Sequence, residues 1–116
     1  PKKLVILGDG NQDKPYIHVS DLVNAILFIQ SKSNDKINFF NIGVENSTKV
    51  NQIAKYVVKG MKLKDVKFEY TGGKQGWPGD VPKFQYDINK LKKIGWLPRL
   101  TSDEAVKKTI VELVKS

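Results

Sequence analysis

A short apolar segment near the middle of the chain places the strongest constraint on the fold. In the segment Asn38-Phe39-Phe40-Asn41-Ile42-Gly43, apolar residues stand at neighbouring positions, so an extended backbone would present them on both of its faces. Strands of this kind usually lie inside a parallel sheet that is covered on both faces. With 116 residues, the chain can hardly supply both covers. The sequence therefore predicts an α/β fold that forms part of a larger domain.

The remaining elements follow from apolar periodicity and turn residues, and they give short strands with about four helices, an α/β arrangement close to α+β. We expect further strands over residues 4–7 and 66–70, and helices over residues 21–31, 47–60, 87–91 and 102–114. Residues that can cap these helices stand at Ser20 or Asp21, Ser47 or Thr48, Asp87, and Ser102. The first helix is apolar around most of its circumference, which predicts burial on more than one side. Glycines and prolines between Thr71 and Pro82 predict a long loop, and such loops tend to be functional.

Composition excludes several kinds of site. The chain has no cysteine and a single histidine, His18, which rules out disulfides, thiolate zinc sites and iron–sulfur clusters and disfavours a histidine-based metal centre. No apolar run is long enough to cross a bilayer, and the amino terminus lacks the pattern of a signal peptide. We therefore expect a cytoplasmic protein with no metal and no membrane partner.

The net charge of +8 raises the question of an anionic partner. Of the 20 cationic side chains, only Arg99 is an arginine, the residue that base edges and bidentate phosphate contacts favour. Lysines scattered along helices are more often a solvated face. Nucleic acid is therefore a disfavoured partner, although a free-standing basic module for nucleic acid or another anion stays open as an alternative function.

Two motifs of nicotinamide-dependent enzymes are incomplete. Gly8-Asp9-Gly10 supplies two glycines of a Gly-x-Gly-x-x-Gly fingerprint, but residue 13 is Asp and no helix follows directly. The Tyr-x-x-x-Lys spacing occurs at Tyr70–Lys74 and Tyr86–Lys90, yet the chemistry needs both side chains on one helical face. Glycines interrupt the first pair and the cap expected at Asp87 interrupts the second, so neither pair is predicted to be catalytic.

His18 and Asp21 are both predicted to be structural. No serine, cysteine or paired carboxylate stands at a recognisable catalytic spacing from His18, which favours a hydrogen-bonded structural histidine over a general base. Asp21 is more simply a helix cap than a catalytic acid.

Two polar segments, residues 8–16 and 76–82, carry the strongest functional pattern. The first brings a flexible turn to Lys14 just before an ordered segment, and the second places Trp77 and Asp80 on a loop between glycines and prolines. A cation for phosphate, a ring for stacking and a carboxylate for sugar hydroxyls are the parts of a nucleotide-sugar pocket. The alternative is that Trp77 only covers the core and that Lys14 is only solvated.

These segments and those between them resemble the carboxy-terminal part of the NAD-dependent epimerase/dehydratase family, the extended short-chain dehydrogenases typified by UDP-glucose 4-epimerase. Five pieces occur in family order: Leu-Gly-Asp-Gly-Asn-Gln with Tyr-Ile-His-Val-Ser-Asp-Leu-Val-Asn-Ala, Phe-Asn-Ile-Gly, Gly-Trp-Pro-Gly-Asp-Val-Pro, Asp-Ile-Asn-Lys-Leu-Lys-Lys-Ile-Gly-Trp-Leu-Pro, and a Ser-x-Glu-Ala helix. The resemblance implies that residues 1–116 form one unit, roughly the last third of an extended Rossmann-type enzyme whose amino-terminal NAD-binding domain is missing. It also implies that residues 39–43 form the outermost strand of the dinucleotide-binding sheet and that the first helix packs against them.

The resemblance also implies substrate-binding residues. Backbone groups of Val5 and Leu7 would hold the nucleotide base, Lys14 would meet the diphosphate where the family usually has Arg, and Asp80 would meet the ribose. Trp77 stands where the family usually has a second Arg. If the loop folds back, Lys74 could replace that arginine.

The family's catalytic residues and glycine-rich NAD loop lie upstream, so the resemblance assigns no catalytic or cofactor-binding residue here. NAD is expected in the full-length parent and not on this chain. The predicted function is the substrate-binding portion of a nucleotide-sugar epimerase, inactive alone, with a nucleoside-diphosphate sugar, most simply a UDP-sugar, as partner. A dehydratase or reductase of the same family is the alternative, and exposed apolar surface predicts possible homo-oligomers.

Overall fold

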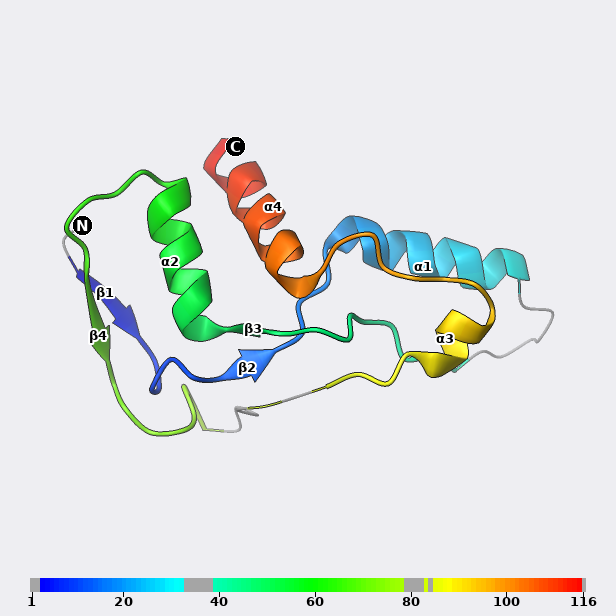
Figure 1. Cartoon of the computed structure of the whole chain (residues 1–116), viewed down its shortest axis with the longest axis horizontal. Coiled ribbons are helices and arrows are strands. Elements are labelled where there is room, and N and C mark those ends of the chain that lie inside the picture. The colour runs from blue at the N-terminus through cyan, green and yellow to red at the C-terminus, as the bar shows by residue number, and fades with distance from the viewer. Residues whose placement is uncertain (1–2, 33–38, 79–82, 84, 116) are drawn as a thin grey trace.

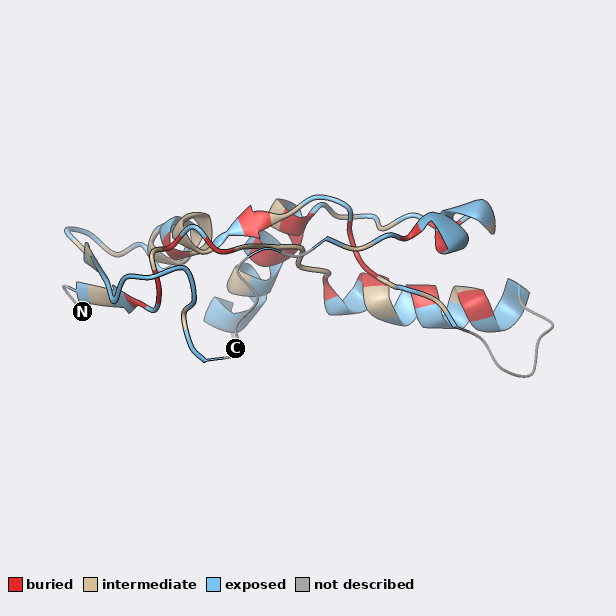
Figure 2. Ribbon diagram, turned by 90° about the horizontal axis from the view of Figure 1, so that it is seen from below, coloured by how far each residue is buried: buried red, intermediate tan, exposed pale blue. Residues whose placement is uncertain are grey.

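The computed structural model describes residues 3–32, 39–78, 83 and 85–115 and has an elongated shape (Figure 1). Its extents are 54 × 32 × 18 Å and its radius of gyration is 16.8 Å. A compact domain of this length would have a radius of gyration of about 13 Å. Figure 2, turned by 90°, shows how thin the molecule is. The elements in chain order are β1 (Lys3–Ile6), β2 (Asp13–Lys14), α1 (Val19–Lys32), β3 (Thr48–Lys49), α2 (Val50–Gly60), β4 (Lys67–Tyr70), α3 (Asn89–Lys93) and α4 (Ser102–Lys115).

One end of the molecule contains β1, β4, α2 and α4 (Figure 1). Strands β1 and β4 are parallel, with Leu4 opposite Phe68 and Ile6 opposite Tyr70. Helix α2 contacts β1 and packs against α4, and its Ala54 is buried. At the junction with the rest of the chain, β2 and β3 form a two-residue antiparallel pair in which Lys14 lies opposite Thr48.

The other end contains α1 and α3 (Figure 1). Its core is a cluster of four buried side chains, Ala25, Ile29, Leu91 and Trp96. Phe28, Phe40, Ile42 and Ile94 are partly buried against this cluster. The predicted packing of the first helix against residues 39–43 is therefore confirmed for the side chains of Phe40 and Ile42.

The predicted strand over residues 38–43 is wrong for its described part, residues 39–43. This segment forms no strand. In the described residues, both sheets have only two strands, and neither includes this segment. A β-strand needs backbone partners on a neighbouring strand, so the apolar side-chain pattern alone was not enough to predict a strand here.

The predicted burial of the first helix on more than one side is also wrong. The buried residues of α1, Asp21, Ala25 and Ile29, are spaced by four and form one stripe, seen as separate buried bands in Figure 2. Val23, Ile26 and Leu27 are about half exposed. No described segment covers that side of α1, so its apolar residues face solvent.

Four predicted caps need correction. Helix α2 begins at Val50 with Lys49 as its cap, and no side chain caps it, whereas Thr48 is buried in β3. Helix α4 is capped by Thr101 rather than Ser102: the Glu104 N–H donates to Thr101 Oγ1 at 3.2 Å, and the Thr101 N–H donates to Glu104 Oε1 at 3.0 Å. This reciprocal pair is a capping box.

Asp21 is the third correction, because it lies inside α1 and holds another segment. Its Oδ2 atom accepts the N–H groups of Arg99 and Leu100, each at 3.1 Å. Asp87 is the fourth: the cap of α3 is Ile88, with no side-chain cap hydrogen bond, and Asp87 lies one residue before it, where its Oδ1 accepts the Asn89 N–H at 3.0 Å. Among the described helices, none is long and apolar enough to cross a membrane.

Candidate functional site

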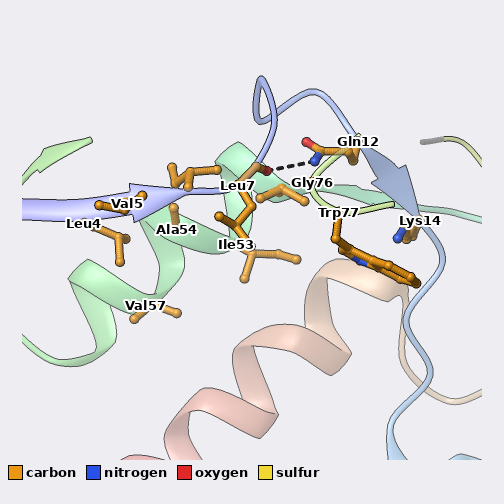
Figure 3. Close-up of a pocket in the computed structure, with 12 residues that line it drawn as sticks. Leu4, Val5, Leu7, Gln12, Lys14, Ile53, Ala54, Val57, Gly76 and Trp77 are labelled. Atoms are coloured by element: carbon orange, nitrogen blue, oxygen red, sulfur yellow. Dashed lines mark hydrogen bonds between the residues drawn. The ribbon is translucent and has the colours of Figure 1, made fainter. Parts of the chain in front are cut away.

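A groove of about 380 Å³ runs between β1, α2 and the segment 76–77 (Figure 3). This size lies within the range of about 300–1,000 Å³ that small-molecule pockets usually occupy. Its lining is mostly aliphatic, with three polar or aromatic side chains at one end. The lining residues are Leu4, Val5, Ile6, Leu7, Gln12, Lys14, Val50, Ile53, Ala54, Val57, Gly76 and Trp77.

Four of the five predicted substrate-binding residues line this one groove. They are Val5, Leu7, Lys14 and Trp77. The fifth, Asp80, lies outside the described residues. Lys14 and Trp77 are separated by more than half of the chain, so sequence proximity does not account for their meeting.

The strand register leaves backbone groups of Val5 and Leu7 directed away from β4. The Thr71 N–H donates to the Ile6 carbonyl at 3.0 Å, and Ile6 lies opposite Tyr70, so Leu4 and Ile6 direct their N–H and C=O groups toward β4. The same groups of Val5 and Leu7 point to the opposite edge, where the described residues place no strand. This open edge borders the groove and offers the N–H and C=O groups of Val5 and the N–H group of Leu7, whose C=O accepts from the Gln12 side chain.

Trp77 and Lys14 supply the ring and the cation at one end of the groove. Figure 3 shows the Trp77 indole extending from its loop toward Lys14. Trp77 is 57% exposed, which does not fit the alternative that it only covers the core. Lys14 is half-buried, so it is not simply a solvated lysine. A flat aromatic face beside a cation suits a ligand with a ring and an anionic group.

Sequence reasoning missed Gln12, which lies between Leu7 and Lys14 in the lining. Gln12 is 3% exposed, and its Nε2 donates to the Leu7 carbonyl at 2.9 Å (Figure 3). Its Oε1 is buried, and no hydrogen-bond partner for it is found among the described residues. A lone glutamine in a polar turn gives no pattern by which to foresee this burial.

Lys74 does not line the groove. It borders a neighbouring hollow of about 280 Å³ together with Asp9, Asn11, Gln12 and Lys83. The two spaces share Gln12. The structure therefore places Lys74 next to the candidate site but not in the groove itself, so Lys74 does not replace the second arginine that the family usually has at the position of Trp77.

The Gly8-Asp9-Gly10 turn does not fit the diphosphate of NAD. Both glycines have positive φ, +89° and +79°, but the turn leads into β2 and not into a helix. Side chains of this chain already fill the space inside it, since a Cβ at Gly8 would lie 2.2 Å from Gln12 Nε2. A dinucleotide cradle needs that space and a helix N-terminus beside it.

His18 is buried and hydrogen-bonded on both nitrogens. Its Nδ1 lies 2.7 Å from Ser20 Oγ, and its Nε2 lies 2.6 Å from Glu112 Oε1 on α4. The hydrogen bond with His18 lowers the pKa of the Glu112 carboxyl from its ordinary value. His18 does not line the groove, and this arrangement agrees with the predicted structural role. The described residues include no group of three or more side chains that could hold a metal ion.

The chain is similar in sequence and in structure to known proteins of one family. Residues 1–43 match the model of the NAD dependent epimerase/dehydratase family. A putative UDP-glucose 4-epimerase of Methanocaldococcus jannaschii is 29% identical over 111 residues, covering 91% of this chain and 32% of that protein. The structure of a UDP-glucose 4-epimerase from Thermotoga maritima, solved with UDP-glucose, is 32% identical with a TM-score of 0.78, covering 97% of this chain and 35% of that chain. The chain is related to the NAD-dependent epimerase/dehydratase family.

Other relatives of this family carry out different reactions. A trifunctional UDP-glucose 4,6-dehydratase/UDP-4-keto-6-deoxy-D-glucose 3,5-epimerase/UDP-4-keto-L-rhamnose-reductase of Arabidopsis thaliana is 29% identical over 108 residues, covering 92% of this chain and 16% of that protein. The chain thus spans about a third or less of the proteins it matches. Its mixed α/β fold of short strands and four described helices corresponds to part of a Rossmann-type epimerase or dehydratase.

Proposed function

We propose that this chain is the substrate-binding portion of an NAD-dependent nucleotide-sugar epimerase, inactive alone, and that its groove holds the nucleoside diphosphate. The observation that carries the proposal is the convergence of Val5, Leu7, Lys14 and Trp77 on one groove. The similarity to the Thermotoga maritima enzyme solved with UDP-glucose supports a UDP-sugar as the ligand.

Each part of the ligand has a chemical counterpart in the groove. The open edge of β1 and the residue after it offer the N–H and C=O groups of Val5 and the N–H group of Leu7 to the edge of a base. Trp77 offers a flat face, and Lys14 offers a positive charge to the diphosphate. Asp80 is assigned to the ribose hydroxyls on the family resemblance. Because lysine is a point charge and not a planar fork, we expect Lys14 to attract the diphosphate with little geometric selection.

NAD belongs, in this proposal, to the full-length parent. When bound there it supplies hydride transfer to and from the sugar. The described residues of this chain bind and orient the substrate and take no part in the transfer, because none of them forms an NAD cradle or a helical Tyr-x-x-x-Lys pair.

A dehydratase or reductase of the same family is the second candidate. The similarity to the trifunctional Arabidopsis thaliana enzyme favours it, because the name of that protein includes dehydratase and reductase activities beside an epimerase activity. Both candidates use the same nucleoside-diphosphate site, so the test below addresses the property they share.

Titration of the 116-residue chain with UDP and UDP-glucose, followed by amide chemical shifts and Trp fluorescence, tests the proposal. We expect shifts at Val5, Leu7 and Lys14, and a fluorescence change that disappears in Trp77→Phe, because the other tryptophan, Trp96, is buried away from the groove. Lys14→Met should weaken UDP binding about tenfold, as the loss of a charged contact does.

The matched control is Lys64→Met, which removes an exposed lysine outside the groove and should leave UDP affinity unchanged. Shifts that map away from the groove would overturn the site assignment. Binding of nucleic acid that falls steeply with added salt, without UDP binding, would favour the basic binding module.

A further inference from the structure

A chain of buried hydroxyl groups joins Tyr16, two residues after β2, to β3 and α4. The Tyr16 N–H donates to Ser102 Oγ at 3.0 Å, Ser102 Oγ lies 2.7 Å from Thr48 Oγ1, and Thr48 Oγ1 donates to Asp103 Oδ1 at 2.5 Å. Ser102 is 0% and Thr48 2% exposed, although serine and threonine usually lie at the surface. The Asn46 Oδ1 accepts the Ser102 N–H at 2.5 Å and completes the network.

The network has a single consistent donor direction. Because Thr48 gives its only hydroxyl hydrogen to Asp103, the hydrogen between Thr48 and Ser102 must come from Ser102. Ser102 Oγ in turn accepts from the Tyr16 backbone. Each hydroxyl therefore donates once and accepts once, and the chain of bonds ends on a carboxylate, which strengthens it.

The network holds the backbone at Lys14 and just after it. On the β3 side, Lys14 lies opposite Thr48 in the β2–β3 pair. Two residues later, the Tyr16 N–H is fixed to Ser102. Lys14 is thus paired with the strand that carries Thr48 and lies two residues before the attachment of Tyr16 to Ser102, and its side chain lines the groove.

We propose that Thr48 and Ser102 are positioning residues for Lys14, which fix its backbone so that its ammonium group meets the phosphate groups of a bound nucleoside diphosphate. The inference rests on the proposed function of the groove. Neither hydroxyl lines the groove, so their effect on the ligand is indirect. A flexible lysine side chain on a fixed backbone loses less freedom on binding than one on a mobile loop.

The test compares two probes, UDP and uridine, which differ in the diphosphate. Thr48→Val removes one hydroxyl at nearly constant volume and should weaken UDP binding about fivefold, the effect of about one hydrogen bond, with less than about twofold change for uridine. Thr48→Ser, which keeps the hydroxyl, should restore UDP affinity. In a Lys14→Met background, Thr48→Val should cause no further loss, because the group it positions is gone.

One control and one alternative variant keep the result interpretable. Thr109→Val removes a hydroxyl of α4 that donates to the Ala105 carbonyl at 2.8 Å and lies outside the groove, so it should leave UDP affinity unchanged. If Thr48→Val does not fold, judged by its circular dichroism, Ser102→Ala breaks the same network from the α4 side, where the Thr101 cap is retained.

The outcomes separate this inference from the proposed function. If the wild-type chain does not bind UDP, the proposed function fails and the inference fails with it. If the wild type binds UDP but Thr48→Val weakens UDP and uridine equally, or adds its full effect to that of Lys14→Met, the groove stands and the positioning role is refuted.

Discussion

The buried carboxylate of Asp21 gives the sharpest stability prediction. Its Oδ2 accepts two backbone N–H groups, those of Arg99 and Leu100, both at 3.1 Å. Asp21→Ala removes both bonds. Arg99 is exposed and Leu100 half-buried, so water can reach these amides and each bond is assigned the lower value for a charged acceptor, about 1.5 kcal/mol. Asp21→Ala should therefore destabilise the chain by about 3 kcal/mol.

Asp21→Asn is the matched variant, because both amides use the same oxygen. An asparagine carbonyl oxygen at that position can accept both bonds and loses only the charge, so we expect a cost of about 1 kcal/mol. Urea titrations in a Trp77→Phe background, followed by Trp96 fluorescence and by circular dichroism, measure both values. If Asp21→Asn costs as much as Asp21→Ala, or if Asp21→Ala costs less than about 1 kcal/mol, the assigned role of the two bonds is refuted.

Three further predictions concern packing, titration and backbone conformation. Leu91→Ala, at a fully buried position of the cluster that also contains Ala25, Ile29 and Trp96, should cost about 3 kcal/mol in the same urea assay, and a value below about 1 kcal/mol would contradict the burial. The pKa of the Glu112 carboxyl is lowered by its bond with His18, so this contact stabilises the fold above pH 4.5 and is lost as the pH falls through the lowered folded-state pKa. The melting temperature of the wild type should therefore fall toward that of Glu112→Gln on acidification, and a constant difference would contradict it. Gly95 has φ +102°, and a Cβ there would meet Phe28 only at 3.7 Å, so Gly95→Ala should cost about 1–2 kcal/mol from backbone strain alone, and a stabilised variant would exclude that strain.

Helices were predictable from this sequence because their patterns are local. The spacing of apolar residues predicted α1, α2 and α4, and the closely spaced glycines and prolines predicted the loop that follows β4. The strand expected at residues 39–43 failed because a strand depends on partners elsewhere in the chain, which the sequence does not show. Helix caps were misplaced by one or more residues. Thr101 and Ser102, for example, both carry a hydroxyl that can cap a helix, and packing decides that Ser102 is buried while Thr101 caps α4.

For the site, the family resemblance reached further than residue spacing. It named Val5, Leu7, Lys14 and Trp77, and the structure brings these residues to one groove. It did not indicate Gln12, whose amide is buried beneath the turn. The hydroxyl pair of Thr48 and Ser102 was foreseen only as helix caps. These two hydroxyls bond to each other across more than 50 sequence positions, and no local pattern reveals such a contact.

The elongated shape has a consequence for how a ligand would alter the protein's motions. The groove belongs to the end that contains β1 and α2, whereas α1 and α3 surround a separate apolar cluster at the other end. Ligand binding slows the local opening of the segments that it contacts, while segments that open independently keep their own rates. Amide hydrogen exchange with saturating UDP should therefore slow in β1 and α2 and stay unchanged in α1. Equal protection of α1 would show that the two ends open as one cooperative unit.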